Sequence, residues 1–252
     1  MPKNIQDIDV VVLAGGLGTR LRSIITSVPK VLANVDGRPF IYYLLDSLCN
    51  IGICRVILST GYQADQLEKS LGVQYKSIHI SYSKESTPLG TGGALRFATK
   101  YIEKDLVLVM NGDSFVDVNY GDFLSWHVDR GVEVSIVVKT VVGENRYETV
   151  ILDPESNIVE IVGRNAKARD KQSFINAGVY LIQKRSLQKL PKRQVSSLEK
   201  DFLPLFVGAD LSGYYTNGAF IDIGTPESLK RAPRFFKLLQ RNGYRPQICG
   251  IS

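Results

Sequence analysis

The sequence contains few of the residues that mark disulfide-rich, zinc-binding or membrane-spanning proteins. Its 252 residues include three cysteines and two histidines, and neither His79 nor His127 has a Cys or His partner at metal-ligand spacing. The longest apolar runs have the length of a strand, and the N-terminal segment has no apolar signal-peptide core. We therefore expect a cytoplasmic protein with reduced cysteines and no membrane partner.

The sequence also lacks any concentrated block of charge. Lys and Arg number 31 against 25 Asp and Glu, which gives a net charge of +6, but the cations are scattered along the chain. A protein that follows a nucleic-acid backbone would gather them into a run or stripe. We expect no nucleic-acid partner, and the excess fits either a mild surface bias or a small phosphate-bearing substrate.

What is present is a regular alternation of apolar strands and helices. In the first half, β-branched and apolar runs predict strands at 9–14, 55–59, 77–83 and 106–110. Helices are predicted between them at 39–50, 64–71 and 93–102. This order predicts an α/β fold with a Rossmann-like, doubly wound and mostly parallel sheet.

The rhythm of the pattern changes after Asp113. Strands predicted at 132–142, 148–152, 158–162 and 174–182 follow one another closely, and helices are predicted at 197–206 and 227–239. The close spacing indicates a mixed-sheet extension. Because no repeat or long linker intervenes, we expect one domain over 1–252, with an N-terminal lobe at 1–112 and a C-terminal lobe at 113–252.

A glycine-rich turn follows the first strand, at the edge where open α/β sheets bind ligands. Gly15, Gly16 and Gly18 would let backbone N–H groups approach a phosphate. No Gly-Lys-Ser/Thr follows, which excludes a Walker loop. Leu21 stands where the dinucleotide fingerprint needs a small residue, and Asp36, near the position of its ribose-binding acid, begins an Asp-Gly turn. A Rossmann dehydrogenase and a purely structural strand-to-helix turn remain as alternatives.

Basic residues follow this turn. Arg20, Arg22 and the pair Pro29-Lys30 lie close behind it, where Arg can grip a phosphate bidentately and Lys can act as a point charge. The string Gly-Gly-Leu-Gly-Thr-Arg-Leu at 15–21, followed by Pro-Lys, resembles the signature of the sugar-phosphate nucleotidyltransferase family. Four later segments extend the resemblance: Leu-Gly-Thr-Gly-Gly-Ala at 89–94, Asn-Gly-Asp at 111–113, Asn-Ala-Gly-Val-Tyr at 176–180 and Phe-Ile-Asp-Ile-Gly-Thr-Pro at 220–226.

The resemblance implies transfer of a nucleoside monophosphate from a nucleoside triphosphate to a sugar 1-phosphate, with release of pyrophosphate. The attacking phosphate oxygen is ionised at neutral pH, so the reaction needs positioning and charge stabilisation rather than a protein nucleophile or general base. The family pattern assigns Arg20 to the β- and γ-phosphates and Lys30 to the α-phosphate. It assigns Asp113 and Asp222 to Mg²⁺. A cap or turn role is the structural alternative for either aspartate.

The same resemblance makes the N-terminal lobe nucleotide-binding and the C-terminal lobe sugar-phosphate-binding. The expected nucleotide contacts are Leu13, Ala14, Gly15, Gly16, Gly18, Thr19, Arg20, Gly90, Thr91, Gly92 and Gly112. The expected sugar-phosphate contacts are Tyr147, Glu148, Arg164 and Asn176. Glu148 stands where relatives have Gly, and Gly163-Arg164 stands where they have a Glu-Lys pair whose Lys grips the sugar phosphate. Arg164 is our candidate for that cation, with Lys167 and Lys171 as alternatives.

Within the family, the segments at 89–94, 174–180, 196–201 and 220–228 most resemble those of D-glycero-α-D-manno-heptose 1-phosphate guanylyltransferases. This implies GTP and a heptose 1-phosphate as substrates, and a GDP-sugar for bacterial surface glycans as the product. Mannose 1-phosphate guanylyltransferases and uridylyl- or thymidylyltransferases of other hexoses remain alternatives, as does a non-catalytic regulatory subunit that binds nucleotide sugars. A homodimer is left open.

Overall fold

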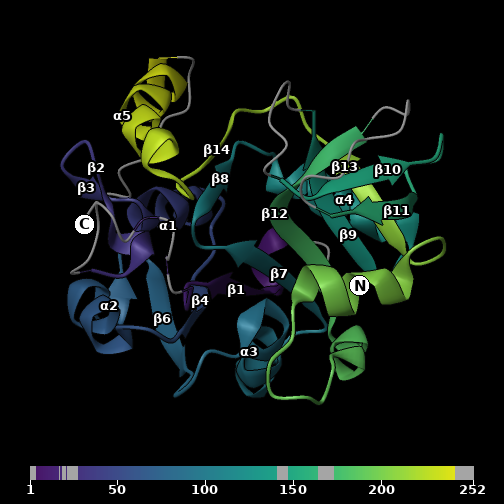
Figure 1. Cartoon of the computed structure of the whole chain (residues 1–252), viewed down its shortest axis with the longest axis horizontal. Helices are drawn as coiled ribbons and strands as arrows, with labels where there is room; N and C mark the ends of the chain where they lie inside the picture. The colour runs from purple at the N-terminus through teal and green to yellow at the C-terminus, as the bar shows by residue number, and fades with distance from the viewer. Residues whose placement is uncertain are drawn as a thin grey trace.

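The structure, a computed structural model, describes residues 4–16, 18, 21, 28–140, 147–163 and 173–241. Within this part of the chain, ten strands form one sheet (Figure 1). Its parallel centre has the order β6 (Ile78–Lys84), β4 (Arg55–Thr60), β1 (Asp9–Leu13) and β7 (Leu106–Asn111). The short β5 (Gln74–Tyr75) pairs antiparallel with β6 at the edge.

The parallel strands are rich in β-branched residues because both of their faces are covered. Val10, Val11 and Val12 of β1 are all fully buried, which a strand exposed on one face would not show. One face packs against α1 (Ile41–Asn50), α2 (Ala64–Leu71) and α4 (Tyr120–Arg130), and α5 (Pro226–Arg241) packs on the outer side of α1, where Phe236 stacks on Tyr43 with centroids 3.8 Å apart. The other face packs against α3 (Gly90–Ala98) and the short helical turns between 184 and 206 (Figure 1). The predicted doubly wound α/β fold is confirmed.

The strand β12 (Ser173–Gln183) joins the parallel centre to the C-terminal part of the sheet. It runs antiparallel to β7, to β9 (Val134–Lys139) and to β10 (Thr149–Leu152). Beyond these, β11 (Ile158–Val162) pairs with β10, and β13 (Leu211–Tyr215) pairs in parallel with β9. The expected mixed-sheet extension is therefore present, and one sheet runs through both predicted lobes.

The pairing of β12 with β9 is interrupted between Asn176 and Tyr180. Gly178, inside the interruption, has a φ of +77°, and a Cβ at this position would lie 2.6 Å from Nδ2 of Asn111. Both the backbone conformation and the close approach therefore require glycine. The resulting bulge lies beside the carboxyl end of β7, where the candidate site is found.

Two predicted helices begin at other residues in the structure. The segment at 39–50 becomes helical only at Ile41, because Pro39 belongs to the two-residue strand β3 (Arg38–Pro39), which pairs with β2 (Asn34–Val35) around the Asp36-Gly37 turn. In the other direction, α3 begins at Gly90 rather than at residue 93. The second glycine-rich segment is thus the first turn of a helix.

Several elements of the C-terminal half differ more from the sequence-based expectations. The pattern missed α4, which Asn119 caps through its side chain and Gly131 ends in the left-handed conformation. It also missed the pair β8 (Ser114–Val116) and β14 (Phe220–Asp222). The predicted helix at 197–206 is a π-helical turn (Leu198–Phe202) followed by a 3₁₀ turn (Leu203–Phe206), because Pro204 cannot donate the backbone hydrogen bond of a regular helix.

The two histidines have structural environments. His127 is fully buried, its Nδ1 lies 2.7 Å from the Ser135 hydroxyl, and burial lowers its pKa to about 4. His79 is exposed on β6. Among the described helices, none combines the length and the apolar character that a membrane crossing requires.

Candidate active site

A cavity of about 570 Å³ opens at the carboxyl edge of β1 and β7 and extends to the bulge of β12. The predicted site residues that line it are Leu13, Ala14, Gly15, Gly16, Gly18, Lys30, Gly90, Thr91, Asp113, Tyr147, Glu148, Asn176 and Asp222. The residues named for the nucleotide and those named for the sugar phosphate therefore face one shared space. This is the arrangement that a transfer between two bound substrates requires.

Five predicted residues are not placed in this lining. Thr19, Arg20 and Arg164 lie outside the described residues, as do the alternatives Lys167 and Lys171. Gly112 lies behind the cavity wall, where its N–H donates to the Leu13 carbonyl (2.9 Å) and a Cβ would lie 2.9 Å from that oxygen. Gly92 is buried and donates its N–H to the Ser196 carbonyl (2.9 Å). Gly92 and Gly112 thus have packing roles, and direct contact with the nucleotide stays a prediction.

The two candidate metal ligands come from the short strands that the sequence pattern missed. Asp113 precedes β8, and Asp222 ends β14. In this antiparallel pair Asp222 stands opposite Ser114, and the Ile223 N–H donates to the Asp113 carbonyl (2.9 Å). Residues more than a hundred positions apart are therefore held together by backbone hydrogen bonds. This pairing explains why the two segments can form one site.

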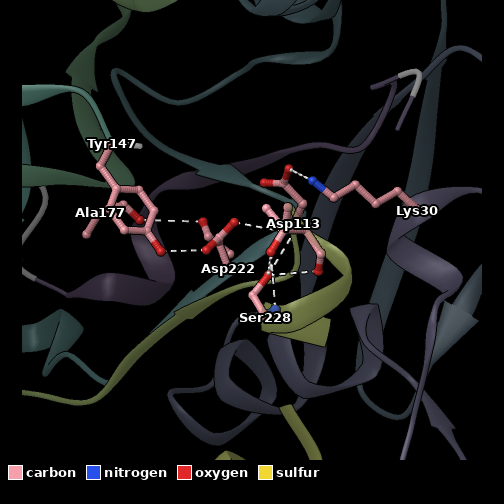
Figure 2. Close-up of polar contacts among 9 residues, drawn as sticks. Lys30, Asp113, Tyr147, Ala177, Asp222 and Ser228 are labelled. Atoms are coloured by element: carbon pink, nitrogen blue, oxygen red, sulfur yellow. Dashed lines mark hydrogen bonds and ion pairs between the residues drawn. The ribbon is translucent and has the colours of Figure 1, made fainter. Parts of the chain in front are cut away.

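Lys30 completes this end of the cavity. Its Nζ lies 2.5 Å from Oδ2 of Asp113, and the side chains of Lys30 and Asp113 are 14% and 41% exposed (Figure 2). A Cβ at Gly224, two residues after Asp222, would lie 3.8 Å from Nζ. The ammonium group therefore lies between the Asp113 carboxylate and the turn that carries Asp222.

The Asp222 carboxylate is held on both of its oxygens. The Tyr147 hydroxyl donates to Oδ1 (2.5 Å; Figure 2). The Gly224 N–H donates to Oδ2 (2.8 Å). The Tyr147 ring also packs edge-on against Phe220, with centroids 5.5 Å apart. The predicted sugar-contacting tyrosine thus has a further role, which is to orient the second carboxylate.

The donor set at this end fits a hard divalent cation. Within the described part of the chain, no three His, Cys, Asp or Glu side chains are grouped closely enough to hold an ion by themselves. Asp113 and Asp222 offer carboxylate oxygens, which Mg²⁺ prefers, and this ion usually completes its shell with water and substrate phosphate oxygens. Two carboxylates in the lining of this cavity therefore suit a metal that binds together with a nucleotide.

The opposite wall carries a carboxylate that sequence analysis did not single out. Glu85 follows β6 and approaches the first glycine turn so closely that a Cβ at Gly15 would lie 2.9 Å from its Oε1, and one at Gly61 would lie 2.5 Å away. Its Oε2 is buried and has no hydrogen-bond partner among the described residues. Burial raises the pKa of Glu85, partly offset by a hydrogen bond from the Leu89 backbone. No motif surrounds this residue, so only its place in the wall marks it.

The floor of the cavity is polar. Asn176 donates through Nδ2 to the Tyr180 hydroxyl (3.0 Å), and its Oδ1 accepts the Gly178 N–H (2.9 Å). Oδ1 of Asn111 is buried and has no hydrogen-bond partner among the described residues. Burial, with the nearby charges of Glu199 and Glu148, raises the pKa of Tyr180 well above its usual value, so its hydroxyl remains protonated at neutral pH.

Comparisons with known proteins agree with this geometry. The profile of the family described as "Nucleotidyl transferase" matches residues 9–237. The chain belongs to the nucleotidyl transferase family. The predicted enzyme class is thereby confirmed, and nucleotidyltransferases of this family generally use a divalent metal ion.

Individual relatives are similar over nearly their full length. The chain is 33% identical over 227 residues to the D-glycero-α-D-manno-heptose 1-phosphate guanylyltransferase of Aneurinibacillus thermoaerophilus, which covers 90% of this chain and 97% of the relative. It is 36% identical to the crystal structure of HddC from Yersinia pseudotuberculosis, with a TM-score of 0.80 over 91% of this chain and 99% of that one. The same Yersinia protein complexed with GMP-PN gives a TM-score of 0.79 at the same identity and coverage.

Proposed function

We propose that this nucleotidyltransferase transfers GMP from GTP to D-glycero-α-D-manno-heptose 1-phosphate, releasing pyrophosphate and forming a GDP-heptose for surface glycans. The observation that carries the proposal is the convergence of Lys30, Asp113 and Asp222 at one end of a cavity that the glycine turn also lines. A non-catalytic sugar-nucleotide sensor would not need these three charged groups together. The two similar proteins named for, or crystallised with, guanine nucleotides support the choice of base.

The charged end accounts for the chemistry. Asp113 and Asp222 would hold Mg²⁺, which when bound supplies Lewis acidity and offsets charge on the α-phosphate. The Lys30 ammonium group, now paired with Asp113, would turn to the α-phosphate oxygens and stabilise the charge that builds up there. The glycine turn, with Gly18 at a φ of +58°, provides backbone N–H groups for the remaining phosphates. Arg20 is proposed for the departing pyrophosphate.

The half-buried carboxylate of Glu85 supports guanine as the base. The Watson–Crick edge of guanine carries two adjacent donors, N1–H and the N2 amino group, and an ionised carboxylate can accept both. Glu85 lines the same cavity as Gly15, Gly90 and Pro88, and it follows β6, which is three strands away from β7, the strand that precedes Asp113. We therefore propose that the base lies against this wall, with the phosphates reaching toward the charged end.

The sugar phosphate is proposed to lie over the polar floor. Asn176 and Glu148 line that part of the cavity and can bond sugar hydroxyls. Tyr147 lies where its ring can face the sugar while its hydroxyl holds Asp222. Arg164 is proposed as the cation that grips the sugar phosphate.

A substrate matrix tests the proposal. Each of GTP, ATP, UTP and dTTP is incubated with D-glycero-α-D-manno-heptose, mannose, glucose and N-acetylglucosamine 1-phosphates, and the products are identified by mass. We expect Mg²⁺-dependent pyrophosphate release that is fastest with GTP and the heptose 1-phosphate. Faster turnover with mannose 1-phosphate would assign the mannose guanylyltransferase activity instead. No product in any combination would favour the regulatory alternative.

A further inference from the structure

One carboxylate in the cavity wall has no role in the proposed reaction. Glu199 belongs to the π-helical turn Leu198–Phe202, which the chain reaches after leaving the sheet, and it lines the cavity at the sugar end. Its Oε2 accepts hydrogen bonds from the hydroxyls of Thr91 (2.8 Å) and Ser197 (2.7 Å). Two hydroxyls on one oxygen fix the orientation of the whole carboxylate.

The anchoring residue Thr91 is itself fixed. Its Oγ1 accepts the Leu198 N–H (2.8 Å) while it donates to Glu199, so two hydrogen bonds inside the protein fix the hydroxyl. The neighbouring glycines allow this contact, because a Cβ at Gly90 would lie 2.5 Å from the Ser196 carbonyl oxygen and one at Gly92 2.9 Å from the Ser196 hydroxyl. The second glycine-rich segment therefore brings α3 against the turn that carries Glu199.

The other oxygen of this carboxylate is available. In the part of the chain that the structure describes, no hydrogen bond occupies Oε1 of Glu199, and the residue is only half-buried in the cavity wall. Tyr180 and Asn176 line the same region, and the charge of Glu199 acts on the Tyr180 hydroxyl. An anchored acceptor thus lies beside the polar floor on which the sugar is proposed to rest.

We propose that Glu199 accepts a hydrogen bond from a hydroxyl group of the sugar 1-phosphate and so helps to select the sugar. The inference rests on the proposed function, since it assigns a further contact within the same site. An uncharged polyol would meet two carboxylates at this end, Glu199 and Glu148, and both accept from hydroxyl groups. A sugar that carries its own carboxylate, such as a hexuronic acid 1-phosphate, would be repelled.

The preorganised carboxylate makes the contact selective. Hydrogen bonds to an ionised acceptor are roughly twice as strong as neutral ones. A substrate that lacks the matching hydroxyl leaves the acceptor desolvated and unpaired, and sites built in this way discriminate strongly against such analogues. The KM for the sugar 1-phosphate should therefore rise with one particular deoxy sugar and not with all of them.

The test compares Glu199→Gln with the wild-type enzyme, using D-glycero-α-D-manno-heptose 1-phosphate and its 2-, 3-, 4- and 6-deoxy analogues. Glu160→Gln, at an exposed position of β11 outside the cavity lining, is the matched control. We expect Glu199→Gln to raise the KM for the heptose 1-phosphate by about tenfold, the typical effect of losing one charge-assisted hydrogen bond, while the KM for GTP stays within about twofold. One deoxy analogue should have a high KM with the wild-type enzyme, and Glu199→Gln should raise that KM little further.

Equal penalties for every deoxy analogue in both enzymes would overturn the proposal, as would a parallel rise in the KM for GTP. If Glu199→Gln fails to fold in a thermal melt, Glu199→Asp is judged by the same two criteria. Aspartate keeps the negative charge, but its shorter side chain moves the accepting oxygen away from the sugar. Wild-type pyrophosphate release reports separately on the proposed function. If the wild type turns over its substrates but Glu199→Gln does not change the pattern of deoxy penalties, the Glu199 inference is refuted and the proposed function stands.

Discussion

The Tyr147 hydroxyl lies 2.5 Å from Oδ1 of Asp222, so a residue expected to contact the sugar also orients a candidate metal ligand. The second oxygen of Asp222 is held by the Gly224 N–H, and the Tyr147 ring rests against Phe220 on the strand that carries the aspartate. The proposed sugar and metal sites therefore share Tyr147. A change in one should be measurable in the other.

We predict that Tyr147→Phe lowers the affinity of the enzyme for its metal ion while the protein remains folded. Removing a hydrogen bond behind a metal ligand typically costs about 10- to 100-fold in metal affinity. The Mg²⁺ concentration for half-maximal activity should therefore rise. The Kd for Mn²⁺, followed by electron paramagnetic resonance, should rise as well. Tyr215→Phe removes a comparable hydroxyl at an exposed position and is the control. An unshifted Mn²⁺ titration in Tyr147→Phe would show that the contact has no such role.

For Glu85 we predict loss of guanine selectivity. Glu85→Gln should raise the KM for GTP by about tenfold or more, because an acceptor for two donors is lost. The wild type should use ITP, which lacks the N2 amino group, less well than GTP, and this difference should shrink in Glu85→Gln. Glu155→Gln, at an exposed loop position, should behave as the wild type. If GTP and ITP remain as different in the Glu85→Gln enzyme as before, another group reads the base.

The same assignment predicts a pH dependence. Burial raises the pKa of Glu85, so protonation begins at a higher pH than for an ordinary glutamate. Recognition of guanine needs the ionised form, so the KM for GTP should rise as the pH falls through the raised pKa. The profile should be flatter for Glu85→Gln, which has no proton to gain. Identical KM profiles for the two enzymes would argue against a carboxylate contact.

For Lys30 we predict an effect on turnover rather than on nucleotide binding. Losing one group that stabilises transition-state charge typically costs ~3–4 kcal/mol. Lys30→Ala should therefore lower kcat by orders of magnitude, while the affinity for GTP measured by calorimetry changes much less. Lys84→Ala removes an exposed ammonium group whose partners are Asp65 and Glu68, and it should leave kcat unchanged. A large loss of GTP affinity with normal kcat would reassign Lys30 to ground-state binding.

The sugar-phosphate cation is predicted from the sequence alone, since Arg164 lies outside the described residues. Arg164→Ala should raise the KM for the sugar 1-phosphate by at least about tenfold, equivalent to ~1.4 kcal/mol. The KM for GTP should stay within a few-fold. Lys167→Ala and Lys171→Ala are the matched comparisons, and a selective effect in either one would move the assignment to that lysine.

The features predictable from the sequence are those with local causes. The buried run at 9–13 and the glycines after it follow from strand periodicity and turn chemistry, and in the structure Gly15, Gly16 and Gly18 line the cavity. The contribution of Glu85 and Glu199 could not be foreseen in this way. Glu85 belongs to no motif, and Glu199 lies in the segment 196–201, whose resemblance to relatives assigned it no role; the function of each becomes visible only when the fold brings it to the cavity wall.

The strands and the helix that the sequence pattern did not predict were missed for related reasons. The strands β8 and β14 have three residues each, too few for a periodic signal, and they exist because they pair with one another across more than a hundred residues. The resemblance to the family still placed Asp113 and Asp222 together, because its motifs record that pairing. The Asn119 cap and the Gly131 terminus of α4 were readable signals, but the helix between them mixes aromatic and charged residues without a clean apolar stripe.

The central claim is that Asp113 and Asp222 act together on one metal in nucleotidyl transfer. Pyrophosphate release from GTP and the sugar 1-phosphate should be measured at saturating Mg²⁺ for wild type, Asp113→Asn and Asp222→Asn, with thermal melts to confirm folding. We predict that each substitution lowers kcat by orders of magnitude in a protein that still folds cooperatively, because each isosteric amide removes a charged metal ligand from an open cleft. Near-normal kcat in either folded variant would contradict the account.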